Sequence, residues 1–157
     1  MINVCRIVVL RKGYLPIRIA EELKTALLKY REATGLGRGI AAPQIGSSKR
    51  VFITYVGDKF QMYINPKIER YSEETNKFRE LCMSSGVMWG DIERPENIIM
   101  TWTDENGGLH ESQKFESFEA RLLQHEYDHV EGMVTLDKTI PGTNSFVRDN
   151  PAEEKLR

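Results

Sequence analysis

The segment His125-Glu126-Tyr127-Asp128-His129, an HExxH pattern, restricts how this chain can fold more than any other feature. Residues four apart lie on one face of an α-helix, so a helix here can bring both imidazoles to one metal ion. Glu126 follows the first histidine and can accept a proton from a water molecule that the metal activates. The alternative is a helix with two buried histidines and an exposed glutamate. The pattern favours a helical metal site.

A catalytic site of this kind usually has a third protein ligand and one open position. Metzincin-type proteases would have a histidine where this chain has Thr135, although Gly132 fits their pattern. Thermolysin-like enzymes would use a downstream glutamate, but Glu153 and Glu154 follow a proline in a tail without helical periodicity. The remaining good ligand is Cys82, because a thiolate binds Zn²⁺ or Fe²⁺ well. Alone, this cysteine would be interpreted as a small buried residue; beside an incomplete HExxH site, the ligand role is favoured.

A glycine-rich segment over residues 35–46 follows the first predicted helix. Its alternate glycines and its Ala-Ala-Pro sequence allow the backbone to approach a ligand closely. It lacks the Gly-Lys-Ser/Thr of a P-loop and the GxGxxG of a dinucleotide-binding turn. A flexible connector is the alternative interpretation. Gln44 is the one good polar donor of this segment.

The composition is that of an ordinary folded protein. The chain has 157 residues, 40% hydrophobic and 29% charged, which predicts one domain over residues 1–157. A net charge of −1 gives no reason to expect nucleic-acid binding, and no apolar run is long enough to span a membrane. Two cysteines do not make a disulfide framework. The N-terminal apolar stretch lacks a signal-peptide cleavage site. We therefore expect a cytoplasmic location, or an organellar one if a transit peptide has been removed.

Hydrophobic periodicity predicts two amphipathic helices. The first covers roughly residues 19–33, with glutamates early and Gly35 after its end. The second covers residues 117–131, with Ser117 as its N-cap and Gly132 as its stop.

Strand-like segments lie between the helices. Residues 51–64 predict a β-hairpin that ends at Asn65-Pro66, and residues 97–103 and 109–115 predict a second pair. Residues 4–10 are a short strand or a tucked terminus. The expected fold is α+β, with antiparallel β-sheets packed around a central HExxH helix and an N-terminal amphipathic helix. The tail over 137–157 is expected to be mostly irregular.

Three of these segments, taken in order, resemble motifs of the peptide deformylase family: GxGxAAPQ, EGCLS and HExDH. Here they are Gly37-Arg-Gly-Ile-Ala-Ala-Pro-Gln44, Glu80-Leu-Cys-Met-Ser84 and Gln124-His-Glu-Tyr-Asp-His129. Ile64-Asn65-Pro66 and Arg94-Pro95-Glu96 also resemble the family. The resemblance runs from about residue 6 to about residue 137.

The resemblance implies a metal-dependent hydrolase of protein biosynthesis. It would remove the N-formyl group from the N-terminal formyl-methionine of nascent polypeptides. One divalent metal ion would be held by Cys82, His125 and His129. The family favours Fe²⁺ for it, with Zn²⁺, Ni²⁺ and Co²⁺ as alternatives that the ligand types do not separate.

The resemblance also implies roles for other residues. Glu126 would accept and return a proton, and the Gln44 side chain with the backbone N–H of Met83 would stabilise the oxyanion. Arg94 and Asp128 would support the site from outside, although a surface position for Asp128 stays open. The expected substrate contacts are Arg38, Gly39, Phe78, Glu80, Leu81, Trp89 and Leu122, and Glu80 is equally a candidate for a supporting role.

Four positions depart from the family pattern. Leu81 stands where the family has glycine, and Arg38 stands where an aliphatic residue is usual beside the substrate. Gly86 replaces a proline after the cysteine motif, and Arg121 replaces an apolar residue in the turn before the metal helix. These departures bear on the shape of the substrate pocket.

Two other functions stay open. One is a zinc endopeptidase, which the missing third ligand after HExxH disfavours. The other is a divergent, weakly active or non-catalytic relative that binds peptides. The expected partners are formyl-methionyl nascent peptides, with a transient ribosome contact as a further expectation. We expect a monomer with no affinity for nucleic acid or membranes.

Overall fold

The computed structural model describes residues 5, 6, 8, 17–86 and 88–146. Of the segment predicted over 4–10, only Cys5, Arg6 and Val8 belong to this part, and residues 147–157 of the predicted tail lie outside it. Within the described residues, no helix is both long and apolar enough to cross a membrane.

In the described part of the chain, eight strands form two antiparallel sheets. The larger sheet has the order β1-β2-β3-β6-β7, and the smaller has the order β4-β5-β8. The larger contains β1 (Gly39–Ala41), β2 (Val51–Val56), β3 (Lys59–Tyr71), β6 (Asn97–Thr103) and β7 (Leu109–Glu116). The smaller contains β4 (Thr75–Leu81), β5 (Met88–Pro95) and β8 (Ser145–Phe146). The α+β class with antiparallel sheets is confirmed.

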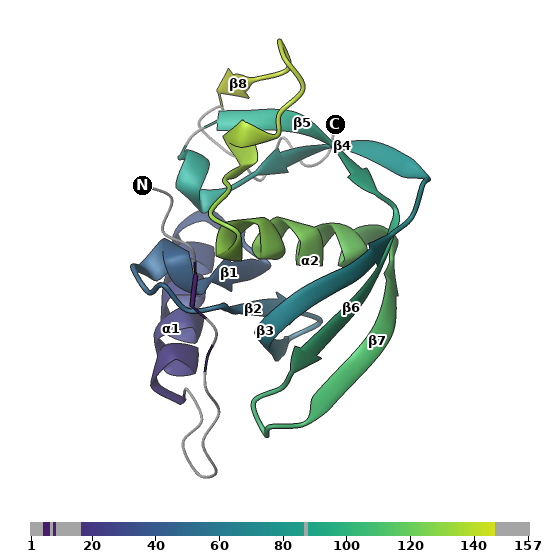
Figure 1. The fold of residues 1–157 in the computed structure, drawn as a ribbon. Helices are drawn as coiled ribbons and strands as arrows, with labels where there is room; N and C mark the ends of the chain where they lie inside the picture. The colour runs from purple at the N-terminus through teal and green to yellow at the C-terminus, as the bar shows by residue number, and fades with distance from the viewer. Residues whose placement is uncertain (1–4, 7, 9–16, 87, 147–157) are drawn as a thin grey trace.

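Two α-helices accompany the sheets. They are α1 (Ile17–Thr34) and α2 (Ser117–Val130), and α2 carries the HExxH segment. Figure 1 shows α2 between the larger sheet and the smaller one. Three short 3₁₀ helices complete the described part: η1 (Ala42–Ile45), η2 (Met83–Ser85) and η3 (Thr135–Asp137).

The larger sheet is buried on both faces at β2, which explains the continuous apolar run of this strand. Val51 and Ile53 pack with Leu27 of α1 in one core cluster. Phe52 points to the opposite face and packs with Leu123 of α2 in the other cluster. Each fully buried side chain of this size contributes about 2 kcal/mol of hydrophobic stabilisation. These two layers hold β1 and α2 against each other.

The hairpin is longer than predicted. The prediction that Asn65-Pro66 ends its second strand is wrong, because β3 continues to Tyr71. Asn65 has a φ of 51°, and the register against β6 shifts between Ile64 and Lys67, so the pair forms a bulge within the strand. The Asn65 side chain bonds to the backbone of Val8 at 2.7 and 2.8 Å.

The ends of α2 are only partly as predicted. The prediction of Ser117 as N-cap is wrong: Glu116 occupies that position with extended backbone and no side-chain capping bond. Gly132 does end the helix, with a φ of 82°. Its N–H bonds to His129 O, and the Met133 N–H bonds to Asp128 O, which is a Schellman motif.

Candidate metal centre

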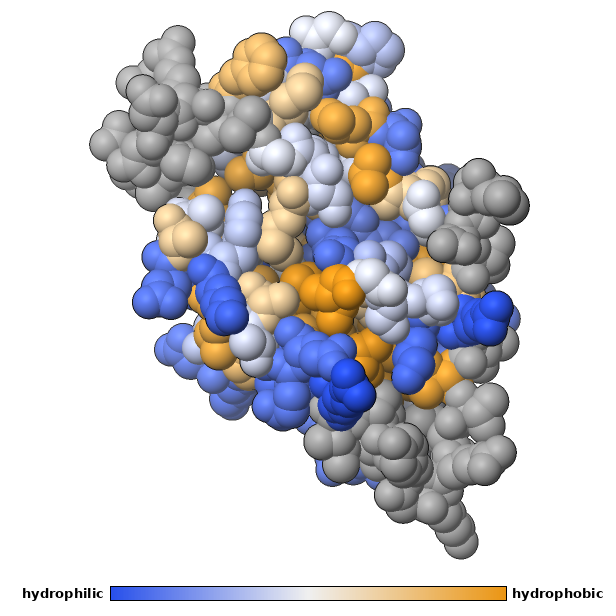
Figure 2. Space-filling model, turned by 90° about the vertical axis from the view of Figure 1, so that its left-hand side faces the viewer, coloured by the Kyte–Doolittle hydropathy of each residue, from blue (hydrophilic) through white to orange (hydrophobic). Residues whose placement is uncertain are grey.

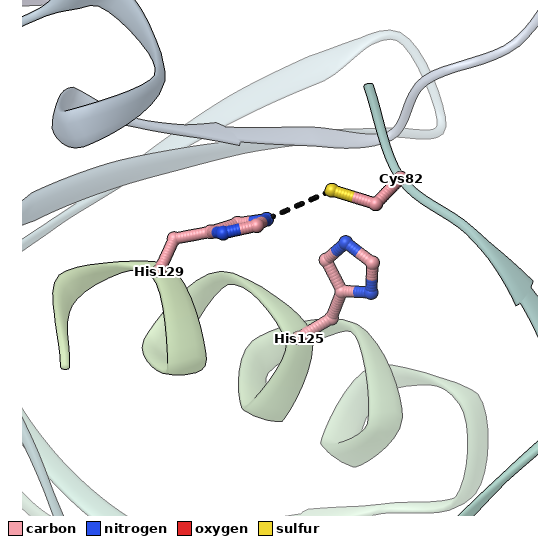
Figure 3. Close-up of side chains that lie close together, drawn as sticks. All are labelled: Cys82, His125 and His129. Atoms are coloured by element: carbon pink, nitrogen blue, oxygen red, sulfur yellow. Dashed lines mark hydrogen bonds between the residues drawn. The ribbon is translucent and has the colours of Figure 1, made fainter. Parts of the chain in front are cut away.

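Three side chains with metal-binding atoms converge at the centre of the molecule. The ligand atoms of Cys82, His125 and His129 lie within 4.8 Å of one another. The two histidines project from one face of α2, and Cys82 stands between β4 and η2 (Figure 3). Its Sγ lies 3.1 Å from His129 Nε2. Among the described residues, this is the only such cluster of three or more histidine, cysteine or acidic side chains.

Both histidines are oriented by a bond on the far side of the ring. His125 Nδ1 lies 2.8 Å from Glu80 Oε2, and His129 Nδ1 lies 3.1 Å from the Met133 carbonyl oxygen. Such bonds fix the tautomer and leave Nε2 of each ring available as a ligand.

Behind the histidines lies a buried network of charges. Arg94 binds both oxygens of Glu80, at 2.7 and 3.0 Å, and reaches Asp128 Oδ2 at 2.8 Å. Arg121 makes a further ion pair with Glu80, and Lys138 makes one with Asp128. Asp128 is 6% exposed, so the alternative of a surface aspartate is wrong. The network fixes Glu80 and thereby His125.

Electrostatics favour a thiolate at Cys82. Burial alone would raise the pKa of this thiol, but hydrogen bonds from His125 and His129 lower it to about 4. Burial would lower the pKa of His125, but its hydrogen bonds to Cys82 and Glu80 raise this pKa instead. A thiolate is the form of cysteine that binds metal ions.

Glu126 is buried beside this cluster without a full set of partners. It is 3% exposed, and its Oε2 has no hydrogen-bond partner among the described residues. Burial raises its pKa to about 7, although the nearby histidines act in the opposite direction. A Cβ atom on Gly39 would lie 2.7 Å from Glu126 Cδ, so the glycine makes room for this carboxylate. A carboxylate with such a pKa can take up and return a proton near neutral pH.

The side chain of Gln44 extends from η1 toward Cys82. Its Oε1 accepts a bond from the Ala41 N–H at 2.8 Å, which orients the amide. Its Nε2 lies 3.1 Å from Ser84 Oγ and 3.7 Å from Cys82 Sγ. Met83 is the first residue of η2, directly after the cysteine. Both predicted oxyanion donors therefore stand next to Cys82.

A cavity of about 390 Å³ lies beside this cluster of side chains. Every predicted substrate contact is on its wall: Arg38, Gly39, Phe78, Glu80, Leu81, Trp89 and Leu122. Gln44, Cys82, Met83, His125 and Glu126 line it as well. Glu80 has both oxygens bound to Arg94, Arg121 and His125. One face of the molecule carries hydrophobic surface at its centre with hydrophilic side chains around it (Figure 2).

Several residues of the cavity wall were not predicted from the sequence. Tyr30, Arg31, Leu36 and Phe118 line the cavity. Arg121, expected in a turn before the metal helix, instead lies inside α2 and is 8% exposed. Phe118 precedes Leu122 by four residues, and Arg121 precedes His125 by four residues. This helical spacing would have placed Phe118 and Arg121 on the face of the metal site.

Comparison with known proteins identifies one family. The family model described as "Polypeptide deformylase" matches residues 8–145. A peptide deformylase of Pseudothermotoga lettingae is 36% identical over 141 residues, which are 88% of this chain and 81% of that protein.

Solved structures give the same result. A probable peptide deformylase from Synechococcus phage S-SSM7 matches with a TM-score of 0.76 and 29% identity, over 85% of this chain and 89% of that one. A peptide deformylase from Acinetobacter baumannii, solved with Met-Ala-Ser bound, matches with a TM-score of 0.73 and 26% identity, over 87% and 91% of the two chains.

Proposed function

Because the chain belongs to the peptide deformylase family, we propose that it removes the N-formyl group from the N-terminal formyl-methionine of nascent polypeptides. One observation carries the proposal: Cys82, His125 and His129 converge, and Cys82, His125 and the buried Glu126 line one cavity. We assign the activity to a single domain over residues 1–157 and expect a cytoplasmic monomer, with transient ribosome contact.

Cys82, His125 and His129 would hold a divalent metal ion. One thiolate and two imidazoles suit Fe²⁺, Zn²⁺, Ni²⁺ or Co²⁺, and we favour Fe²⁺ because the family resemblance implies it. The unpartnered oxygen of Glu126 fits such an ion, since it leaves an acceptor for water beside the three ligands. When bound, the ion would polarise the formyl carbonyl and supply a water nucleophile at neutral pH.

Glu126 would manage the proton of this reaction. It would accept a proton from the attacking water at its free oxygen and return it to the amine that leaves. A pKa near neutrality, raised by burial, suits both transfers. Gly39 supports the role, because its missing side chain leaves the carboxylate in place against β1.

Gln44 and Met83 would stabilise the negative charge on the formyl oxygen. The Ala41 N–H holds the side-chain amide of Gln44 through Oε1, and the Nε2 group that now donates to Ser84 Oγ would turn to the formyl oxygen. The backbone N–H of Met83 would be the second donor.

The substrate backbone would lie along β1, the edge strand of the larger sheet. The Tyr55 N–H bonds to the Arg38 carbonyl, and Gly39 pairs with Thr54, so Gly39 is in a non-hydrogen-bonded pair. Its N–H and C=O consequently point away from β2 and can bind an extended peptide. Phe78, Leu81, Trp89 and Leu122 would surround the methionine side chain.

Formate release from formyl-Met-Ala-Ser by the iron- or nickel-loaded protein tests the proposal. We expect multiple turnovers with this peptide and no cleavage of an unformylated internal peptide bond. Cleavage of the internal bond would favour the endopeptidase alternative. Peptide binding without formate release would favour a non-catalytic relative.

The Cys82→Ser variant tests the ligand set. A hydroxyl is a poor substitute for a thiolate, so we expect metal content to fall well below one ion per chain after dialysis. Elemental analysis measures this, with the wild-type protein loaded in parallel. Full occupancy in the variant would mean that another residue is the third ligand.

A further inference from the structure

The wall of the cavity carries more positive than negative charge. Four arginines line it, Arg31, Arg38, Arg79 and Arg121, against the two glutamates Glu80 and Glu126. The whole chain has a net charge of −1, so this excess is local to the cavity. A local positive excess at a binding cavity favours anionic groups on the ligand.

Three of the four arginines already have partners. Arg121 is paired with Glu80, and Arg79 Nε lies 2.9 Å from Asp91 Oδ1. Arg31 Nη1 donates to the Gly37 carbonyl at 2.6 Å, and its guanidinium lies over the Tyr55 ring.

Arg38 is different, because it forms no ion pair with any of the described acidic residues. Its side chain is exposed, and its guanidinium carbon lies 4.8 Å from the centre of the Phe118 ring. The ring supports one face of the guanidinium and leaves the in-plane N–H groups free. The cation is therefore held at a fixed place without a counter-charge.

The position of Arg38 relates it to the path of the peptide. It directly precedes Gly39, whose free backbone groups would bind the substrate, and Phe118 belongs to the first turn of α2 on the opposite wall. Residues that follow the formyl-methionine along β1 would pass this guanidinium. A carboxylate there can bind the planar fork of arginine through two parallel hydrogen bonds.

We propose that Arg38 is a specificity residue that binds an acidic side chain among the first residues after formyl-methionine. The proposal rests on the proposed function and adds a substrate class to it: nascent chains with aspartate or glutamate near the N-terminus.

The test compares formyl-Met-X-Ser amides in which X is glutamate, alanine or lysine. The amide removes the C-terminal carboxylate, which would itself bind an arginine. We expect kcat/KM for the glutamate peptide to exceed that for the lysine peptide by about three- to tenfold at low salt, mainly through KM. The ratio should shrink at about 1 M salt, where exposed charges are screened.

Charge reversal at Arg38 gives the sharpest result. The Arg38→Glu variant should prefer the lysine peptide, whereas Arg79→Leu, which removes a paired arginine of the same cavity, should keep the wild-type preference. An unchanged glutamate-to-lysine ratio in Arg38→Glu would overturn the proposal. Calorimetric titration with the unformylated peptides Met-Glu-Ser amide and Met-Lys-Ser amide reads the same preference without turnover. Absence of formate release would then count against the deformylase function, and equal affinity for both peptides against the role of Arg38.

Discussion

Glu126 is a carboxylate buried at the candidate metal centre, and one of its oxygens has no partner among the described residues, an arrangement that costs free energy wherever it has no chemical use. Glutamine has nearly the same shape and cannot accept the proton. We expect Glu126→Gln to keep the metal and lose at least about 100-fold in kcat. Formate release and elemental analysis of the same preparation measure the two quantities. Wild-type turnover in this variant would show that another group accepts the proton.

Leu81 departs from the family pattern directly beside a candidate metal ligand. It is half-buried, lines the cavity and precedes Cys82 directly. If its side chain narrows the cavity, Leu81→Gly should raise kcat/KM on formyl-methionyl peptides and leave metal content unchanged. A rise through KM alone would indicate uniform binding, and a rise in kcat would indicate better transition-state geometry. Lower activity together with lower stability would mean that Leu81 packs the core.

For single residues, the sequence indicated which residue types could form the site, but it did not indicate which distant residues they would contact. The HExxH spacing and the motif around Cys82 were sufficient to nominate the three residues that the structure brings together. The burial of Arg121 was not predictable, because its partner Glu80 lies 41 residues away in the chain. A buried arginine and an exposed one look alike until the fold places a carboxylate beside one of them.

Among the secondary-structure elements, the close contact between β1 and α2 determines the position of Glu126. Gly39 has no side chain to separate the strand from Glu126, and its backbone conformation is open to alanine. In Gly39→Ala the added Cβ would meet the flexible end of Glu126, so we expect this carboxylate to move and kcat to fall by about 10- to 100-fold. The fold and the metal content should be retained.

The neighbouring Ile40 supplies the control. It belongs to the core cluster on the α1 side of the sheet, away from Glu126. Ile40→Val should cost about 1 kcal/mol of stability and leave the rate intact. Equal rates in Gly39→Ala and Ile40→Val would show that Glu126 does not depend on the close approach of β1. Steady-state kinetics and urea unfolding of both variants give the answer.

Elements with a clear hydrophobic period were the ones found from the sequence. Both helices, the hairpin and the strand over 97–103 follow such a period, whereas the strand over 109–115 was predicted from the Asn-Gly-Gly turn before it. Residues 75–81 and 88–95 were not predicted as strands, although they form β4 and β5. In β4 only Glu80 is fully buried, and its burial depends on ion pairs, so the strand shows no apolar alternation. Tertiary charge pairing rather than local pattern decides such a strand.

For the whole molecule, the buried ion pairs join parts that the hydrophobic clusters do not. Glu80 lies on β4, Arg94 on β5 and Arg121 on α2, so the network attaches the smaller sheet to the metal helix. Burial alone would raise the pKa of Glu80, but hydrogen bonds from His125 and Arg94 hold it well below its usual value. A group with a depressed pKa stabilises the fold above its unfolded pKa, and this stabilisation is lost as the pH falls.

Replacing Glu80 should therefore have a pH-dependent cost. Glu80→Gln leaves Arg121 buried without a counter-charge and leaves Arg94 with Asp128 alone, and we expect the free energy of unfolding of the metal-free protein to fall by about 3–5 kcal/mol at pH 7. The wild-type protein loses the contribution of Glu80 below about pH 4.3, so the difference between the two proteins should narrow toward pH 3. Denaturant unfolding at several pH values measures this difference. The control is Glu93→Gln, because Glu93 of β5 forms an exposed pair with Lys77 of β4. A difference that stays constant from pH 7 to pH 3 would mean that packing around position 80, and not its charge, attaches the smaller sheet to α2.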